Sequence, residues 1–118
     1  MKLKVYVYKN CDTCRKALKF LDKHGIAYEA IPIRETPPAP GELSRMLRAQ
    51  SGNLRSLFNT SGGDYKALGM KDRLPSMSDK EAIALLASNG NLVKRPFVIS
   101  QEVALIGFNE ETWETALL

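Results

Sequence analysis

The chain lacks the features that mark several large classes of protein. Among its 118 residues only two are cysteine and one is histidine, which falls short of the four or so ligands of a zinc site within one chain. No apolar run approaches the length that spans a bilayer, and the N-terminus lacks the apolar stretch and cleavage site of a signal peptide. These absences predict a cytoplasmic protein without a membrane partner. In that compartment two cysteines are more often catalytic, redox-sensing or metal-binding than structural.

A large excess of charge of one sign is also missing. Lys and Arg number 17 against 13 Asp and Glu, so the formal net charge is only +4. The basic residues are scattered, with no interleaved aromatics and no nucleic-acid-binding motif. We therefore expect a solvated basic face and no direct contact with nucleic acid. The length suits one domain over residues 1–118, without repeats or linkers, and we expect a monomer.

The hydrophobic pattern predicts strands alternating with helices. Residues 3–8 are β-branched and aromatic, residues 12–24 carry apolar side chains at helical spacing, and residues 27–33 form a second strand. Pro32 indicates that this second strand lies toward an edge of the sheet or ends early. A strand, a helix and a strand in so short a space imply a right-handed unit with a parallel strand pair.

Helical patterns then dominate up to the last quarter of the chain. Ser78 and Glu81 form a capping box at the start of one helix. Residues 97–100 and 103–106 form an antiparallel hairpin, and Trp113 lies on a last helix. The sequence therefore predicts an α/β protein with a mixed four-stranded sheet and a helical insertion, at about residues 40–92, between strands 2 and 3.

The most informative motif is the pair Cys11 and Cys14, placed where the first strand gives way to a helix. A helix N-terminus has free N–H groups and a partial positive charge, which stabilise a thiolate. A second thiol one turn further on can resolve an adduct formed on the first. We predict that Cys11 is the more exposed nucleophile and Cys14 the partly buried resolving thiol. This motif predicts thiol–disulfide chemistry, through a redox-active Cys11–Cys14 disulfide, on a thioredoxin-like scaffold.

Neighbouring charges and other uses of cysteine leave alternatives open. Arg15 adds positive charge beside the motif, whereas Asp12 adds an opposing negative charge. Both thiols could instead be small buried hydrophobes. A metal site is disfavoured because His24, ten residues beyond Cys14 on the same helix, lies roughly 15 Å away, although bridging subunits could supply further ligands.

Two further segments are candidates for binding an anion or a partner. The guanidinium of Arg95 could stabilise a thiolate or bind an oxyanion. Because only ~5–6% of X–Pro bonds are cis, the residues alone favour an ordinary bond between Arg95 and Pro96 and a surface arginine. The turn at residues 59–63, which includes Thr60, offers hydroxyl and N–H groups that could hold an anion, but such a segment is more often simply a turn.

Taken together, these segments make the chain resemble the ArsC/Spx family of thioredoxin-like proteins. The matching stretches occur in the family's order and are residues 10–17, 58–62, 65–68, 92–96 and 107–108. The resemblance implies a thioredoxin-like core with a helical insertion, the reactive cysteine at Cys11, and a cis peptide at Pro96 facing it. It adds Asn10, Arg15, Asn59, Thr60 and Pro96 as candidate substrate-binding or partner-binding residues.

The chain departs from both branches of that family. Its arsenate reductases hold the oxyanion with three arginines, of which only Arg95 is kept, since Asn59 and Gly107 occupy the other two positions. They are recycled by glutathione or glutaredoxin rather than by an adjacent thiol such as Cys14. The Spx-type regulators share the Cys-x-x-Cys switch and contact RNA polymerase. They usually have arginine where this chain has Ser61, and a longer charged tail.

The sequence thus predicts a thiol–disulfide oxidoreductase or redox sensor without a bound cofactor or metal. Cys11 would attack, Cys14 would resolve, and Arg95 with the helix N-terminus would stabilise the thiolate. The partner would be a thiol or disulfide protein or a small thiol, with glutathione, thioredoxin or glutaredoxin as reductant. Two alternatives stay open. One is arsenate reduction, and the other is Spx-like regulation through a subunit of RNA polymerase.

Overall fold

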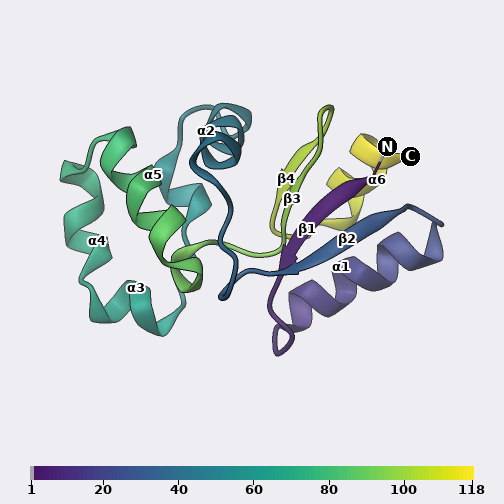
Figure 1. Ribbon diagram of the computed structural model, residues 1–118, viewed down its shortest axis with the longest axis horizontal. Coiled ribbons are helices and arrows are strands. Elements are labelled where there is room, and N and C mark those ends of the chain that lie inside the picture. Colours follow the sequence, from purple (N-terminus) through teal and green to yellow (C-terminus); the bar gives the residue numbers. More distant parts are fainter. Residues whose placement is uncertain (1) are drawn as a thin grey trace.

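The computed structural model describes residues 2–118 and has a four-stranded mixed sheet with helices on both faces (Figure 1). Its strands are β1 (Leu3–Val7), β2 (Tyr28–Pro32), β3 (Phe97–Ile99) and β4 (Ala104–Ile106), in the spatial order β2-β1-β3-β4. The crossover helix α1 (Asp12–Lys23) joins β1 to β2, which run parallel, while β3 is antiparallel to both of its neighbours. The predicted α/β class and mixed four-stranded sheet are confirmed, and β2 lies at an edge, as Pro32 indicated.

The helical elements between β2 and β3 form a separate layer (Figure 1). They are α2 (Pro40–Ala49), η1 (Leu54–Leu57), α3 (Gly63–Ala67), α4 (Met70–Arg73), η2 (Leu74–Ser76), α5 (Asp79–Ser88) and η3 (Gly90–Leu92). The predicted capping box of α5 is present, since the Ser78 hydroxyl accepts from the Glu81 N–H at 3.1 Å and the Glu81 carboxylate accepts from the Ser78 N–H at 2.9 Å. The chain ends in α6 (Glu110–Leu117).

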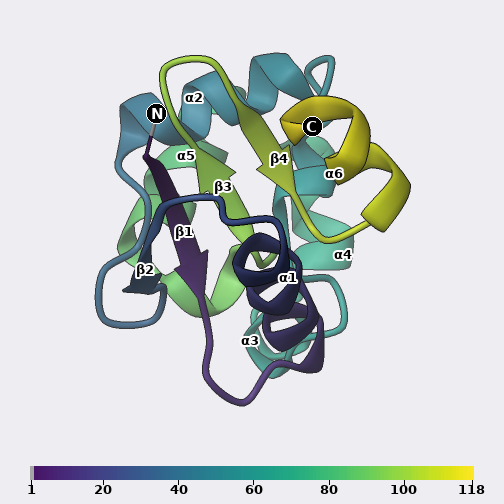
Figure 2. The same ribbon diagram turned by 90° about the vertical axis from the view of Figure 1, so that its right-hand side faces the viewer.

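Alternating side chains of the strands divide the core into two parts. Leu3, Val5 and Val98 pack against α1 and α6, whereas Tyr6 and Phe97 pack against the helical insertion. Figure 2 is seen from the side of α1 and α6, and the insertion helices lie behind the sheet. The N-terminal end of α1 therefore belongs to one layer, and the segments that approach it from the insertion belong to the other.

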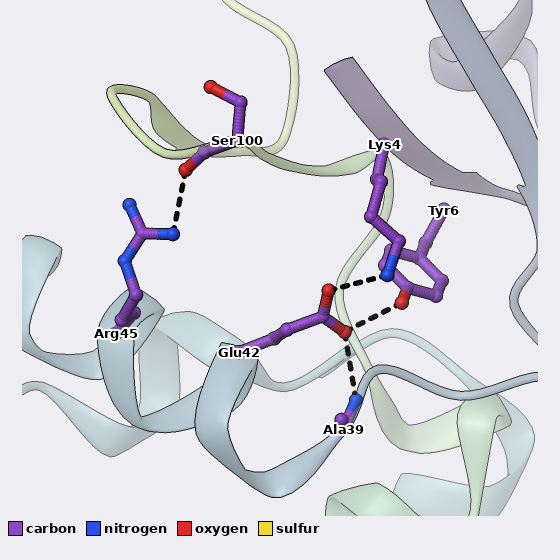
Figure 3. Close-up of polar contacts among 6 residues, drawn as sticks. All are labelled: Lys4, Tyr6, Ala39, Glu42, Arg45 and Ser100. Carbon is purple, nitrogen blue, oxygen red and sulfur yellow. Dashed lines mark hydrogen bonds and ion pairs between the residues drawn. The ribbon is translucent and has the colours of Figure 1, made fainter. Parts of the chain in front are cut away.

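A polar cluster joins the insertion to the sheet (Figure 3). The Glu42 carboxylate on α2 accepts from the Tyr6 hydroxyl at 2.6 Å, the Lys4 ammonium at 2.9 Å and the Ala39 N–H at 3.0 Å. Burial and the contact with Glu42 raise the pKa of Tyr6 to about 12. Burial alone would raise the pKa of Glu42, but its three hydrogen bonds, first that from Tyr6, lower it overall. Arg45 adds a bond of 2.6 Å to the carbonyl of Ser100 in the β3–β4 loop.

Gly90 fixes the return from the insertion to the sheet. A Cβ at this buried position would lie only 1.8 Å from the carbonyl oxygen of Ile33, so no other residue fits without moving the backbone. The close contact sets the path of η3 and of residues 92–96 that follow it. None of the helices within residues 2–118 is both long and apolar enough to cross a lipid bilayer.

Candidate active site

The turn between β1 and α1 places Cys11 at the N-cap of the helix. Its extended backbone (φ −108°, ψ 115°) ends the turn, and its Sγ accepts from the backbone N–H of Cys14 at 3.4 Å. Cys11 is partly exposed, whereas Cys14 is 1% exposed, and both are free thiols. The expected division into an accessible thiol and a buried one is therefore present in the structure.

The environment of Cys14 favours its neutral thiol. Burial is the largest influence and raises the pKa of Cys14 to about 12, helped by the hydrogen bond and charge of Cys11. A backbone hydrogen bond at Tyr8 and the charge of Arg95 act in the opposite direction. At neutral pH Cys14 thus carries a proton next to the sulfur that it would have to attack.

The two charged neighbours of the motif neutralise each other. The Arg15 guanidinium pairs with the Asp12 carboxylate one turn away, and both side chains are largely exposed. Arg15 does not line the cavity around Cys11. Asp12 therefore turns outward, and neither charge is directed at the sulfur.

Cys11 opens into a cavity of about 620 Å³. Of the residues predicted from the sequence, Asn10, Asn59 and Arg95 line it together with Cys11. Thr60 lines a neighbouring cavity instead, while Cys14 and Pro96 are buried and line neither. Sequence reasoning missed several other lining residues, chiefly Tyr8, Thr13, Lys94 and Phe108.

Arg95 is held at the cavity by Tyr8 and by the preceding short helix η3. The peptide bond between Arg95 and Pro96 is cis, as the family resemblance implied and contrary to the ordinary bond favoured by the residues alone. The Arg95 guanidinium carbon lies 5.5 Å from the centre of the Tyr8 ring, and Nη2 donates to the Asn91 carbonyl at 2.9 Å. Its buried Nε has no acceptor among the described residues.

Tyr8 is in turn fixed by two other side chains. Its hydroxyl accepts from Asn10 at 3.2 Å and from Arg34 at 3.0 Å, and the Arg34 guanidinium lies 5.0 Å from the same ring. The hydrogen bond from Asn10, followed by that from Arg34, lowers the pKa of Tyr8. Asn10 thus lines the cavity and also orients the ring on which Arg95 rests.

Lys94 reaches the site because two distant segments pair there. The Asn59 N–H donates to the Leu92 carbonyl at 2.8 Å, and the Lys94 N–H donates to the Leu57 carbonyl at 2.9 Å. Lys94 then passes over Gly107, where φ is +71° and an added Cβ would lie 3.1 Å from Cε of Lys94. The Lys94 side chain therefore lies next to Gly107, one of the two positions at which the arsenate reductases of the resembling family have an arginine.

The site thus combines a thiol at a helix N-terminus, a buried second thiol and two cations, Lys94 and Arg95. Among residues 2–118, no three His, Cys, Asp or Glu side chains gather in a way that could hold a metal ion. Such an arrangement can stabilise a sulfur anion and can attract an anionic group toward it.

Known proteins resemble this chain over nearly its whole length. The sequence model of the ArsC family matches residues 6–116. The protein YusI of Bacillus subtilis is 42% identical over 114 residues, which cover 97% of each chain. The crystal structure of a possible arsenate reductase from Streptococcus mutans is 40% identical, with a TM-score of 0.87, over 95% of this chain and 97% of that one. This likeness confirms the predicted thioredoxin-like fold.

The same comparisons also reach a transcriptional regulator. The global transcriptional regulator Spx of Listeria innocua is 26% identical over 107 residues, which cover 91% of this chain and 80% of Spx. Proteins named as a possible enzyme and as a regulator therefore both align with most of this chain.

Proposed function

The chain belongs to the ArsC family, and we propose that within it the protein acts as a thiol–disulfide oxidoreductase or a thiol-based redox sensor. One observation carries this proposal. The backbone N–H of a buried Cys14 points at the sulfur of an accessible Cys11 at the start of α1. This arrangement supports Cys11 as the attacking thiol and Cys14 as the resolving thiol, since the two lie within one helical turn.

The proposed reaction has two exchange steps. The Cys11 thiolate attacks one sulfur of a disulfide R–S–S–R, which forms a Cys11–S–S–R mixed disulfide and releases RS⁻. Cys14 then loses its proton and attacks the Cys11 sulfur, which forms the Cys11–Cys14 disulfide and releases a second RS⁻. Both RS⁻ groups take up protons. The protein dithiol loses two electrons, and glutathione, thioredoxin or glutaredoxin would return it to the dithiol by the reverse sequence.

The elevated pKa of Cys14 gives this order of steps a physical reason. A thiol that stays protonated does not compete with Cys11 for the incoming disulfide. Once Cys11 is in a mixed disulfide, its negative charge is gone, and with it the contribution of that charge to the pKa of Cys14. Arg95 favours the Cys14 thiolate throughout, so formation of the mixed disulfide itself prepares the resolving step.

The reduction potential of the Cys11–Cys14 pair tests the proposal directly. The protein is equilibrated in glutathione or dithiothreitol redox series, and free thiols are counted by mass spectrometry. We expect a reversible two-electron couple between roughly −120 and −300 mV. Cys11→Ser should abolish exchange, and Cys14→Ser should trap a mixed disulfide. Failure to form the intramolecular disulfide would remove Cys14 as the resolving thiol.

Arsenate reduction is the second candidate function. The similar Streptococcus mutans structure is named a possible arsenate reductase, and in this chain Lys94 and Arg95 line the cavity beside Cys11. These two cations would hold the oxyanion, with glutathione, glutaredoxin or thioredoxin as the source of electrons. Turnover of arsenate with such a thiol donor, raised by Asn59→Arg, would support this function. An unchanged rate in that variant would argue against an oxyanion site built around position 59.

Regulation of transcription is the third candidate, prompted by the similarity to Spx. A subunit of RNA polymerase would then bind with different affinities to the dithiol and disulfide forms. Equal affinities for the two forms would remove the redox switch from this chain.

A further inference from the structure

We infer that a second cavity, which adjoins the cavity around Cys11, binds carboxylate groups, with Arg55 as a specificity-determining residue, so that small acidic thiols and disulfides are the preferred partners. This inference rests on the proposed thiol–disulfide exchange and narrows it to one class of substrate. The cavity has a volume of about 430 Å³ and shares Asn59, Ser61 and Lys94 with the cavity around Cys11. A ligand with its sulfur at Cys11 can therefore extend into it.

Both cavities have the size of small-molecule sites. Their volumes, about 430 and 620 Å³, lie within the range of roughly 300–1,000 Å³ that is typical of ligand pockets. Arg55, on η1, lines the second cavity but not the cavity around Cys11, and Lys94 lines both. The geometry suits a short chain that has a sulfur at one end and a charged group at the other.

The charge around these cavities is of one sign. Arg55, Lys94 and Arg95 line one or both, and none of the described residues that line them is acidic. The ion pairs found within residues 2–118 use other cations, Lys4 and Arg15. The three cavity cations thus keep their charge available for a ligand. A carboxylate accepts charge-assisted hydrogen bonds from such groups, whereas an ammonium is repelled.

Neutral donors at the junction add to this preference. The Asn59 side-chain oxygen accepts from the Ser61 hydroxyl at 3.5 Å, which leaves the amide NH₂ of Asn59 as a donor. Gly62 gives that NH₂ its room, because a Cβ there would lie 2.6 Å from Asn59 Nδ2. Thr60, which carries a hydroxyl, also lines the second cavity. The lining is therefore rich in donors next to the cations.

The test compares three small disulfides of similar length and different charge. These are 3,3′-dithiodipropionate with two carboxylates, hydroxyethyl disulfide without charge, and cystamine with two ammonium groups. Rate constants for mixed-disulfide formation at Cys11 are measured in the Cys14→Ser variant by acid quenching and mass spectrometry. We expect the anionic disulfide to react at least about tenfold faster than the cationic one at low salt, with a smaller ratio at high salt.

Variants at Arg55 then test whether this residue causes the preference for the anionic disulfide. Arg55→Gln should lower the ratio of the anionic to the neutral rate by roughly five- to tenfold, and Arg55→Lys should keep most of it. Arg48→Gln removes the same charge from an exposed position of α2 outside both cavities and should leave the ratio unchanged. Equal ratios in Arg55→Gln and Arg48→Gln, or equal rates for all three disulfides, would overturn the inference.

A binding measurement separates this inference from the proposed function. Calorimetric titration of Cys11→Ser with 3,3′-dithiodipropionate reports the carboxylate site without any exchange. If no disulfide reacts at Cys11, but this binding occurs and is weakened by Arg55→Gln, the carboxylate site stands and the exchange function fails. If exchange occurs at rates independent of charge and no binding is detected, the exchange function stands and the carboxylate site fails.

Discussion

The backbone N–H of Cys14 donates to the sulfur of Cys11 across 3.4 Å, while the Cys14 side chain itself is buried. In the proposed mechanism Cys14 therefore plays two parts, because its backbone N–H contacts the attacking sulfur of Cys11 and its own thiol keeps its proton until the resolving step. The same separation of roles explains why two cysteines so close together need not compete. The pKa of the Cys14 thiol is therefore the most direct quantity to measure.

We expect Cys14 to behave as a thiol of very high pKa in the folded protein. In Cys11→Ser, alkylation of Cys14 by iodoacetamide should be slow and should still accelerate above about pH 9, because burial is the largest cause of its raised pKa and remains in the variant, although the contribution of Cys11 is removed. The unfolded variant in urea is the control, and its rate should level off above the ordinary thiol pKa of about 8.5. A plateau near pH 9 in the folded variant would contradict the burial argument.

A second prediction concerns the ring of Tyr8, on which the Arg95 guanidinium lies. Tyr8→Leu should lower the rate of mixed-disulfide formation at Cys11 by roughly three- to tenfold, because a cation–π contact is worth about 0.5–2 kcal/mol. Tyr8→Phe keeps the ring and should change the rate by less than about twofold on the same grounds. Stopped-flow or quench measurements with a neutral disulfide decide the matter. Equal losses in both variants would assign the effect to the hydroxyl and its partners instead.

The third prediction separates backbone strain from the geometry of the site. Gly107→Ala places a side chain at φ +71° and 3.1 Å from Cε of Lys94, whereas Gly25→Ala meets φ +65° with no neighbour within 4 Å. Both variants should lose about 1 kcal/mol of unfolding free energy, measured in urea. Only Gly107→Ala should also displace Lys94 and reduce the preference for anionic disulfides. If both variants keep that preference, the position of Lys94 over Gly107 is not important for selectivity.

The architecture could be predicted from the sequence because it follows from short-range patterns. Strand and helix periodicity identified β1, α1 and the final hairpin. The position of Cys11 before the helix and of Cys14 in its first turn predicted that Cys14 would be the more buried of the two. The short elements α4 and η2 were not distinguished. A segment of three or four residues is too short to display a period.

Arg95 was predicted as part of the site, but the placement of Lys94 and Arg15 could not be, because it depends on contacts in space. Lys94 reaches the cavity through the pairing of Lys94 with Leu57 and of Asn59 with Leu92, and nothing local to residue 94 indicates this. Arg15 was expected to act near Cys11, but its side chain pairs with Asp12 instead. Which of two orientations a long side chain adopts is decided by its partners in space and not by its position in the chain.

The final prediction uses the contact between the sheet and the insertion (Figure 3). Tyr6→Phe removes the hydrogen bond of 2.6 Å to Glu42 and should cost about 1–2 kcal/mol at neutral pH, because bonds to charged groups are the stronger ones and Glu42 keeps two other donors. The folded protein holds the Tyr6 proton up to a pKa of about 12, against a usual value of 10.0. The unfolded chain therefore releases this proton first as the pH rises.

The raised pKa of Tyr6 should therefore contribute its full share to the unfolding free energy of the wild type below about pH 10. This contribution should be lost between about pH 10 and pH 12. The free-energy difference between the wild type and Tyr6→Phe, measured by urea unfolding in reductant at each pH, should shrink over this interval. Cys14 titrates in the same direction, but its contribution is common to both proteins and cancels in the difference. A gap that stays constant up to pH 12 would mean that Tyr6 ionises equally in the folded and unfolded states, and the contact with Glu42 would then not hold its proton.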